Sequence, residues 1–162
     1  MKNFHILPIL FFLTCFTLLQ AAPIDYLPQV QECSTEKVSI PLTTGKFHLH
    51  VSKTPEKSSP YIQALINEKI TANLSPEENT APIIDVFLAK ADDPLFSDYL
   101  IPPSTVEKPE SYAIRCFHDN EKNAYTICLV GHDNHGVFYA GATFLQMIFN
   151  GKIIISNITD YP

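Results

Sequence analysis

GHDNHGVFYAGATFLQM, residues 131–147, is the stretch that decides the fold of this chain. Its first residue ends an apolar run, and Asp133 or Asn134 can then cap a helix by accepting a hydrogen bond from a free backbone N–H. We expect the helix to continue to about Phe149, because Asn150-Gly151 is a helix-stop signal in which glycine adopts the left-handed cap. The pattern therefore predicts a strand end, a tight turn and a helix.

This helix has almost no polar side. Between residues 137 and 149 only Thr143 and Gln146 carry fully polar side chains, whereas a surface helix shows a polar stripe. We expect it to be covered by its own sheet and by something else. One candidate is the first helix together with the 90–109 loop; the other is a second domain, which Gly141 and Ala142 would allow to approach closely. In the second case an apolar surface stays uncovered in the isolated chain.

Strand and helix patterns continue outward from this stretch. The expected elements are strands 37–41 and 46–52, a helix 61–74, strands 82–89, 111–117 and 124–130, the helix that begins near 134, and a strand 152–158. The unbroken apolar run in 82–89 is typical of an inner strand. The order β-β-α-β-β-β-α-β predicts an α+β fold with a mostly antiparallel sheet and two helices packed on one face.

Residues 90–109 form the longest expected loop. They contain a Pro-Pro pair, Pro109 and several acids. A loop of this length in a compact domain is often functional or packs on another surface.

The amino terminus has the pattern of a secretory signal. Lys2 precedes an apolar run at residues 6–19, which is shorter than the roughly 20 residues that a membrane-spanning helix needs, and Ala21-Ala22 supplies small residues for cleavage. We therefore expect a signal at 1–22, a domain at 23–157 and a secreted or periplasmic protein. An uncleaved anchor is the alternative, and Thr14 makes lipidation of Cys15 a poor fit.

Composition excludes several classes of protein. The chain is 46% apolar, which argues against disorder. It contains 11 Lys and Arg residues and 17 Asp and Glu residues, so its net charge is negative. An acidic chain has no electrostatic reason to bind nucleic acid or an anionic membrane. We expect no nucleic-acid partner and, after signal cleavage, no membrane contact.

Three cysteines lie beyond the expected signal: Cys33, Cys116 and Cys128. None has the C-x-x-C spacing of a zinc or redox site. If the 111–130 hairpin turns near residue 122, Cys116 and Cys128 face each other within disulfide reach. The sequence leaves two alternatives for Cys116 and Cys128: a disulfide bridge, or two buried free thiols.

Histidine pairs are the sharpest candidates for chemistry. His48 and His50 are two apart on an expected strand and share a face, so together they can chelate a metal. His132 and His135 flank the helix cap. Spacing alone shows no convergent set of ligands, so we interpret these histidines as solvent-facing or turn residues.

Acidic residues offer no better site. Asp92, Asp93 and Asp98 lie in the long loop without the alternating ligand pattern of a calcium loop. Asp119 and Glu121 straddle the hairpin turn, where solvent leaves a carboxylate untuned for acid catalysis. No nucleophile elbow and no phosphate loop occur. We therefore expect no catalytic, cofactor-binding or metal-binding residues in this chain.

Several short motifs occur in the order that one group of carbohydrate enzymes shows. They are Leu27-Pro28-Gln29, Ser111-Tyr112 before an apolar strand, Gly136, Phe138-Tyr139, Thr143, Leu145-Gln146 and Asp160-Tyr161-Pro162. Together they resemble the N-terminal accessory domain of glycoside hydrolase family 20, the β-N-acetylhexosaminidases, with family 84 a close second and the family 67 α-glucuronidases similar in this region. The chain departs from the motif at Ala140, Phe144 and Met147.

The resemblance implies a non-catalytic domain that packs on a barrel. Residues 158–162 would begin the linker to that barrel, which is missing here, and the barrel would remove terminal N-acetylhexosamine by a substrate-assisted mechanism. The expected partner is a catalytic barrel, in cis or separately encoded; a homodimer through the uncovered helix face is a further possibility. A free-standing secreted binding module that kept the fold is the alternative function.

Overall fold

A computed structural model describes residues 30–34, 37–42, 46–52, 59–72, 82–97, 99, 101 and 103–161. The expected signal at 1–22 and the carboxylate of Asp98 lie outside these residues. Within them, no helix has the length and apolar character needed to cross a membrane.

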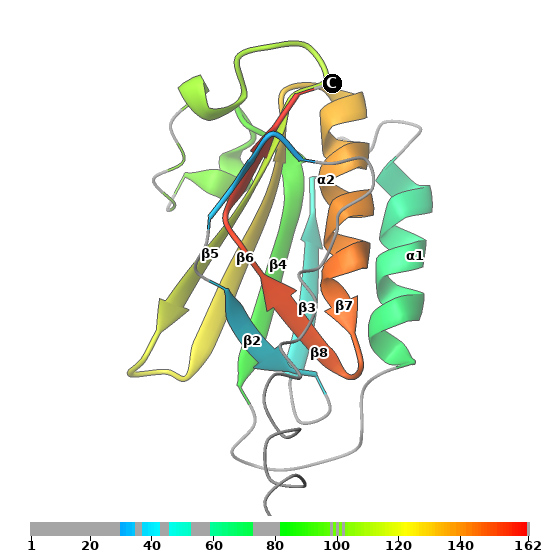
Figure 1. The fold of residues 1–162 in the computed structure, drawn as a ribbon, viewed down its shortest axis with the longest axis vertical. Helices are drawn as coiled ribbons and strands as arrows, with labels where there is room; N and C mark the ends of the chain where they lie inside the picture. The colour runs from blue at the N-terminus through cyan, green and yellow to red at the C-terminus, as the bar shows by residue number, and fades with distance from the viewer. Residues whose placement is uncertain are drawn as a thin grey trace, which may run out of the picture.

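The described residues form an α+β fold built on a mixed six-stranded sheet, here called the main sheet (Figure 1). Its strands run in the order β1-β9-β5-β6-β4-β3. They are β1 (Glu32–Cys33), β3 (Lys46–Val51), β4 (Ile83–Lys90), β5 (Tyr112–Asp119), β6 (Ala124–Gly131) and β9 (Ile158–Asp160).

Strand direction divides the main sheet into two halves. β5 pairs antiparallel with β6 and β9, and β9 pairs antiparallel with β1. β4 instead pairs parallel with both β3 and β6. Parallel neighbours need a crossover connection, which α1 (Ser59–Thr71) provides between β3 and β4. Because β4 is buried between two parallel neighbours, its sequence is the apolar run expected of an inner strand.

A second sheet, here called the small sheet, holds β2 (Val38–Pro41), β8 (Lys152–Ile155) and β7 (Ile148–Phe149) in the order β2-β8-β7. The strands expected at 37–41 and 46–52 therefore belong to different sheets. The strand expected at 152–158 is divided in the same way, because β8 ends at Ile155 and β9 begins in the main sheet at Ile158. The folded domain thus continues through Asp160, beyond the expected boundary at residue 157.

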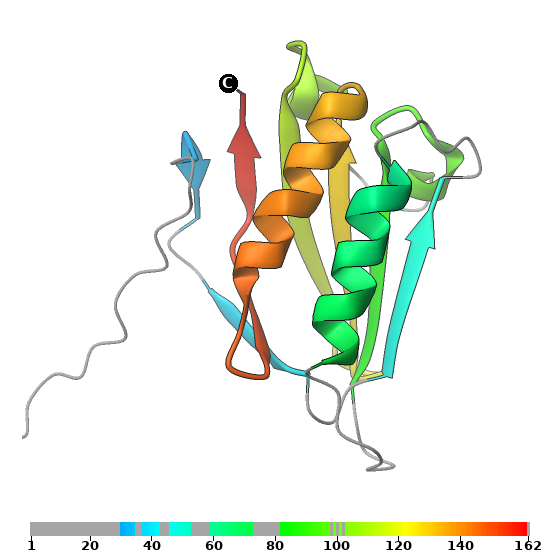
Figure 2. The same cartoon turned by 90° about the vertical axis from the view of Figure 1, so that its right-hand side faces the viewer.

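Both α-helices of the described chain, α1 and α2 (Asn134–Met147), pack on one face of the main sheet, as the sequence predicts (Figure 2). α2 ends two residues before the expected Phe149, because Ile148 turns into β7. The core between helices and sheet consists of large aliphatic and aromatic side chains. Those that are almost fully buried include Ile62, Ile66, Ile84, Leu88, Ile114, Ile127, Leu129, Phe144 and Met147.

The segment after β4 covers the opposite face. It contains two short 3-10 helices, η1 (Pro94–Phe96) and η2 (Pro103–Val106). A smaller apolar cluster forms there from Ala89, Phe96, Val106, Ala113, Cys128 and Val130. In Figure 1 the helices lie on one side of the sheet and this segment on the other. The long loop therefore packs on the sheet and does not cover α2.

The hairpin register shows that the prediction of facing cysteines was wrong. Cys116 pairs with Ile127, and Cys128 pairs with Arg115. The turn is centred half a residue earlier than expected, so the two cysteines lie on opposite faces of the sheet. Cys116 packs against the helix-side core and Cys128 lies in the smaller cluster. Both are free thiols.

Candidate functional site

Asp133 sets the start of α2. Its Oδ1 accepts the backbone N–H of Gly136 at 2.9 Å, and its Oδ2 accepts the N–H of Glu110 at 3.0 Å. Partial burial acts to raise the pKa of Asp133, but these N–H donors and the nearby His132 outweigh it and hold the pKa below its usual value. The sequence left Asp133 and Asn134 open as caps; the structure identifies Asp133.

Two glycines let α2 begin directly against the sheet. A Cβ on Gly136 would lie 2.3 Å from the carbonyl oxygen of Ser111, and a Cβ on Gly131 would lie 2.1 Å from the backbone nitrogen of Val137. Backbone atoms cannot move aside as a flexible side chain can. The first turn of α2 is thereby held against β5 and the end of β6.

The first helix covers one flank of α2. A Cβ on Gly141 would lie 2.4 Å from Cγ1 of Ile62, so the close approach that this glycine permits is used by α1. The expectation that Gly141 would admit a second domain is therefore wrong. On the side of α2 that faces the sheet, Thr143 is the buried polar side chain of the helix. Its hydroxyl forms a 2.8 Å hydrogen bond with the hydroxyl of Tyr112.

The side of α2 that faces away from the sheet remains largely apolar. Phe138, Ala142 and Leu145 are half-buried and Tyr139 is 36% exposed; we call these four residues the outer face of α2. Phe149, two residues beyond the helix, is 59% exposed. Phe138, Ala142 and Leu145 also pack against the main core, so this face is partly covered within the domain. The exposed apolar surface that the sequence predicts is limited here to Tyr139 and Phe149.

Several contacts hold the end of the described chain in place. Asp160 is buried and pairs with Tyr112, and its Oδ1 accepts the backbone N–H of Gln31 at 3.1 Å. The carbonyl of Tyr161 accepts Nε2–H of Gln31, and Nζ of Lys108 lies 3.5 Å from the centre of the Tyr161 ring. Both views place this end of the chain at the same end of the molecule as the first turn of α2. The path of the chain after β9 is therefore fixed through Tyr161.

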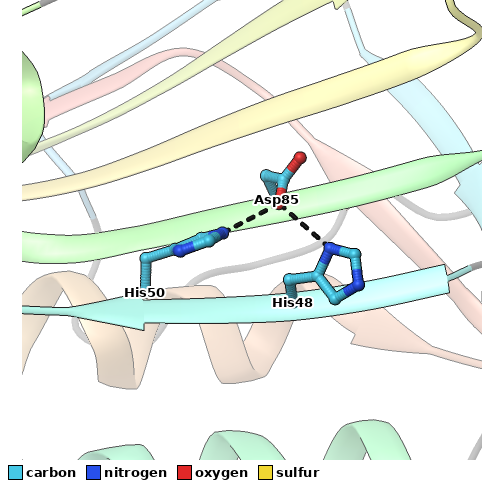
Figure 3. Close-up of polar contacts among 3 residues, drawn as sticks. All are labelled: His48, His50 and Asp85. Atoms are coloured by element: carbon cyan, nitrogen blue, oxygen red, sulfur yellow. Dashed lines mark hydrogen bonds and ion pairs between the residues drawn. The ribbon is translucent and has the colours of Figure 1, made fainter.

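The main sheet also carries a cluster on its other face. His48 and His50 point to the same carboxylate, that of Asp85 on β4 (Figure 3). Nδ1 of His48 lies 3.2 Å and Nε2 of His50 lies 2.8 Å from Oδ1 of Asp85. The sequence predicted that the histidines share a face but missed Asp85. The one feature of the sequence that could have indicated Asp85 is that it is a single acidic residue inside an otherwise apolar strand.

The second histidine pair does not converge. Nδ1–H of His132 donates to the carbonyl of Val106 at 2.8 Å, whereas Nδ1 of His135 lies 3.6 Å from Glu110. His132 thus ties η2 to the turn before α2. Each ring has a separate structural neighbour, as the interpretation of turn residues requires.

The acidic candidates also have structural partners where they are described. Asp93 caps η1 by accepting Leu95 N–H at 2.9 Å, and it accepts the hydroxyl of Ser52 at 2.5 Å. Asp92 is exposed. Asp119 accepts the backbone N–H groups of Glu121 and Lys122 across the hairpin turn.

Comparison with known proteins identifies the fold. No family model and no curated protein sequence matches the chain. The solved structure of CpGH84B is similar with a TM-score of 0.52 and 17% identity, over 86% of this chain and 23% of that one. The structure of CpGH84D is similar with a TM-score of 0.55 and 12% identity, over 84% of this chain and again 23% of that one. Their names place both in glycoside hydrolase family 84. The chain thus spans about a quarter of the length of these hydrolases and shares the fold of that part.

Proposed function

We propose that this chain is the accessory domain of a β-N-acetylhexosaminidase-like glycoside hydrolase and that it acts by packing on a catalytic barrel. The observation that carries the proposal is the extent of the shared fold: more than four-fifths of this chain corresponds to less than a quarter of two much longer family 84 chains. A part of that size, compact in itself, fits an accessory domain.

The outer face of α2 is the proposed contact with the barrel. It is apolar and half-buried, and Tyr139 at its surface is 36% exposed. The anchored Asp160 and Tyr161 would hold the following chain at that end of the domain. An aromatic and aliphatic patch of this kind matches the composition of interface cores, in which tyrosine is enriched.

The finer parts of the proposal rest on the sequence. Family 84 is favoured by the two similar structures, and family 20 by the motif around Phe138-Tyr139 and by Asp160-Tyr161. Export, a role without catalysis and terminal N-acetylhexosamine as the sugar come from the amino-terminal pattern and the resemblance.

The first test is an assay of the purified full chain on a chromogenic N-acetylglucosaminide. We expect no turnover, because the catalytic Asp-Glu pair of the resembled families belongs to the barrel. Turnover that co-purifies with this chain, and not with a contaminant, would remove the non-catalytic role.

The second test measures the contact itself. The DNA after codon 162 and the rest of the genome are searched for a family 84 or family 20 barrel, which is co-expressed with this chain. We expect binding, weakened about 10-fold or more by Tyr139→Asp, because buried interface tyrosines often contribute 1–2 kcal/mol or more. Tyr61→Asp is the control, since Tyr61 is 62% exposed on α1. If such a barrel is not encoded or does not bind, the free-standing module is the better proposal.

A further inference from the structure

Strand pairing brings three metal-ligating side chains to one point on the face of the main sheet opposite the helices. His48 and His50 are two residues apart on β3, so they project to the same side. Asp85 is the direct partner of His48 in the parallel β3–β4 pair. Figure 3 shows both imidazole rings directed at the Asp85 carboxylate.

We propose that His48, His50 and Asp85 bind one divalent transition-metal ion, with Zn²⁺ the best match. Their three ligand atoms all lie within 4.8 Å of one another. Ligands about 2.1 Å from a tetrahedral zinc ion are about 3.4 Å apart. The two histidine nitrogens lie 3.2 and 2.8 Å from Asp85 Oδ1, so an ion needs only small side-chain movements to enter.

The types of donor atom select the metal. Imidazole nitrogen suits zinc, copper, nickel and iron, whereas calcium and magnesium prefer oxygen ligands. Two histidines and one carboxylate also form the ligand set of several catalytic zinc sites, which keep a fourth position for water. The side chains of His48 and His50 are 57% and 41% exposed, so solvent reaches the open position.

An aromatic neighbour orients one of the ligands. The ring of Phe87 stacks on His50, with centroids 4.5 Å apart and planes 13° apart. Phe87 in turn contacts Tyr99, with centroids 5.3 Å apart. Stacking limits rotation of the His50 ring while Nε2 faces Asp85, so part of the entropy cost of metal binding has already been met in the folded protein.

The alternative is a cluster held by hydrogen bonds alone, without a metal ion. Without a metal, both rings can donate N–H groups to the same carboxylate oxygen, and the cluster is then a hydrogen-bonded group with no ligand. The two arrangements differ in whether a metal ion binds with one-to-one stoichiometry through these three residues, and a titration distinguishes them.

The test is a titration of the full chain, produced without a histidine tag, with Co²⁺ and then with Zn²⁺. We expect one Co²⁺ per chain, visible d–d absorption bands from nitrogen and oxygen ligands, and their loss when Zn²⁺ displaces the cobalt. His50→Ala and Asp85→Asn should each weaken Zn²⁺ binding in calorimetry by at least the 10- to 100-fold that loss of an outer metal-site partner costs.

His135→Ala is the matched control, because His135 is likewise an exposed histidine beside a carboxylate, Glu110. It should leave affinity and stoichiometry unchanged. Asp85→Asn keeps the shape of the side chain, and circular dichroism of the metal-free variants shows whether they are folded. No binding by the wild-type chain, equal binding by folded Asp85→Asn, or an equal loss in His135→Ala would overturn the proposal. None of these readouts depends on a catalytic barrel.

Discussion

On one face of the main sheet, two regular helices bury a continuous layer of large aliphatic and aromatic side chains. On the other face, an irregular segment with two short 3-10 helices buries a smaller cluster and leaves His48, His50 and Asp85 accessible to solvent. A helix presents a broad stripe to a sheet, whereas a loop places only a few side chains on it. The helix face should therefore account for most of the stability, and the loop face leaves the histidine side chains exposed to solvent.

The largest expected difference between the two faces comes from removing one aromatic ring on each. Phe144 in α2 is fully buried, and Phe144→Ala should lower the free energy of unfolding by about 3–5 kcal/mol. Phe117 is 38% exposed on the loop face, so Phe117→Ala should lower the free energy of unfolding by less than about 1 kcal/mol. Urea denaturation measures both; similar values for the two variants would contradict the comparison.

Packing between the helices gives the next effect. Gly141→Val places a branched side chain where Ile62 already lies, and we expect a loss of about 1–3 kcal/mol from overpacking. Ala142→Val is the control on the outer face, where the loss should stay near the few tenths of a kcal/mol set by helix propensity. Thermal and urea unfolding report both, and equal losses would mean that α1 and α2 are not in close contact at Gly141.

The cap of α2 should contribute about 1 kcal/mol, in a pH-dependent way. The pKa of Asp133 is lower in the folded chain than its usual value, so its stabilisation is complete above the unfolded pKa of about 3.9 and is lost as pH falls through the folded pKa. Asp133→Ala should therefore destabilise by about 1 kcal/mol at pH 7 and by less at pH 3.

Exposed Asp92 is the control for this cap, and Asp92→Ala should stay within about 0.5 kcal/mol at pH 7. Urea titrations at the two pH values provide the measurement. If Asp133→Ala lowered the free energy of unfolding more at pH 3 than at pH 7, the assigned direction of the pKa shift would be wrong.

The smallest effect concerns thiol reactivity and changes no stability. Burial raises the pKa of Cys116 to about 11, and burial followed by the nearby Cys116 raises the pKa of Cys128 to about 12. Since the thiolate is the reactive form, both should be labelled slowly at pH 8, while exposed Cys33 reacts first. Peptide mapping by mass spectrometry after alkylation identifies each site. A Cys116–Cys128 bridge would contradict the observed register.

The sequence predicted regular features better than pairings. The cap at Asp133, the inner strand near residue 84 and the two helices on one face are confirmed, because each depends on local periodicity or capping. The prediction that Asn150-Gly151 stops the helix was wrong, because α2 ends at Met147 and these two residues form the turn between β7 and β8. The cysteine prediction failed through a one-residue error, since a shift of one residue reverses the face of every side chain in a strand.

The cluster of His48, His50 and Asp85 shows what strand pairing decides beyond the local sequence pattern. That His48 and His50 share a face follows from the two-residue period of any strand. That Asp85 joins them follows from a parallel register between segments separated by a helix, which no local pattern encodes. The same holds for the 91–110 segment, whose irregular backbone gives no period from which to infer what it covers.

By itself, the sequence determined an α+β domain with an unusually apolar second helix, an acidic surface charge and a motif order similar to that of hexosaminidase accessory domains. Tertiary structure alone decided which strands are parallel, that α1 covers the Gly141 side of α2, and that His48, His50 and Asp85 meet on the opposite face of the sheet. The physical reason is that periodicity and capping act between neighbours along the chain. Register and packing are set by contacts between residues far apart in it.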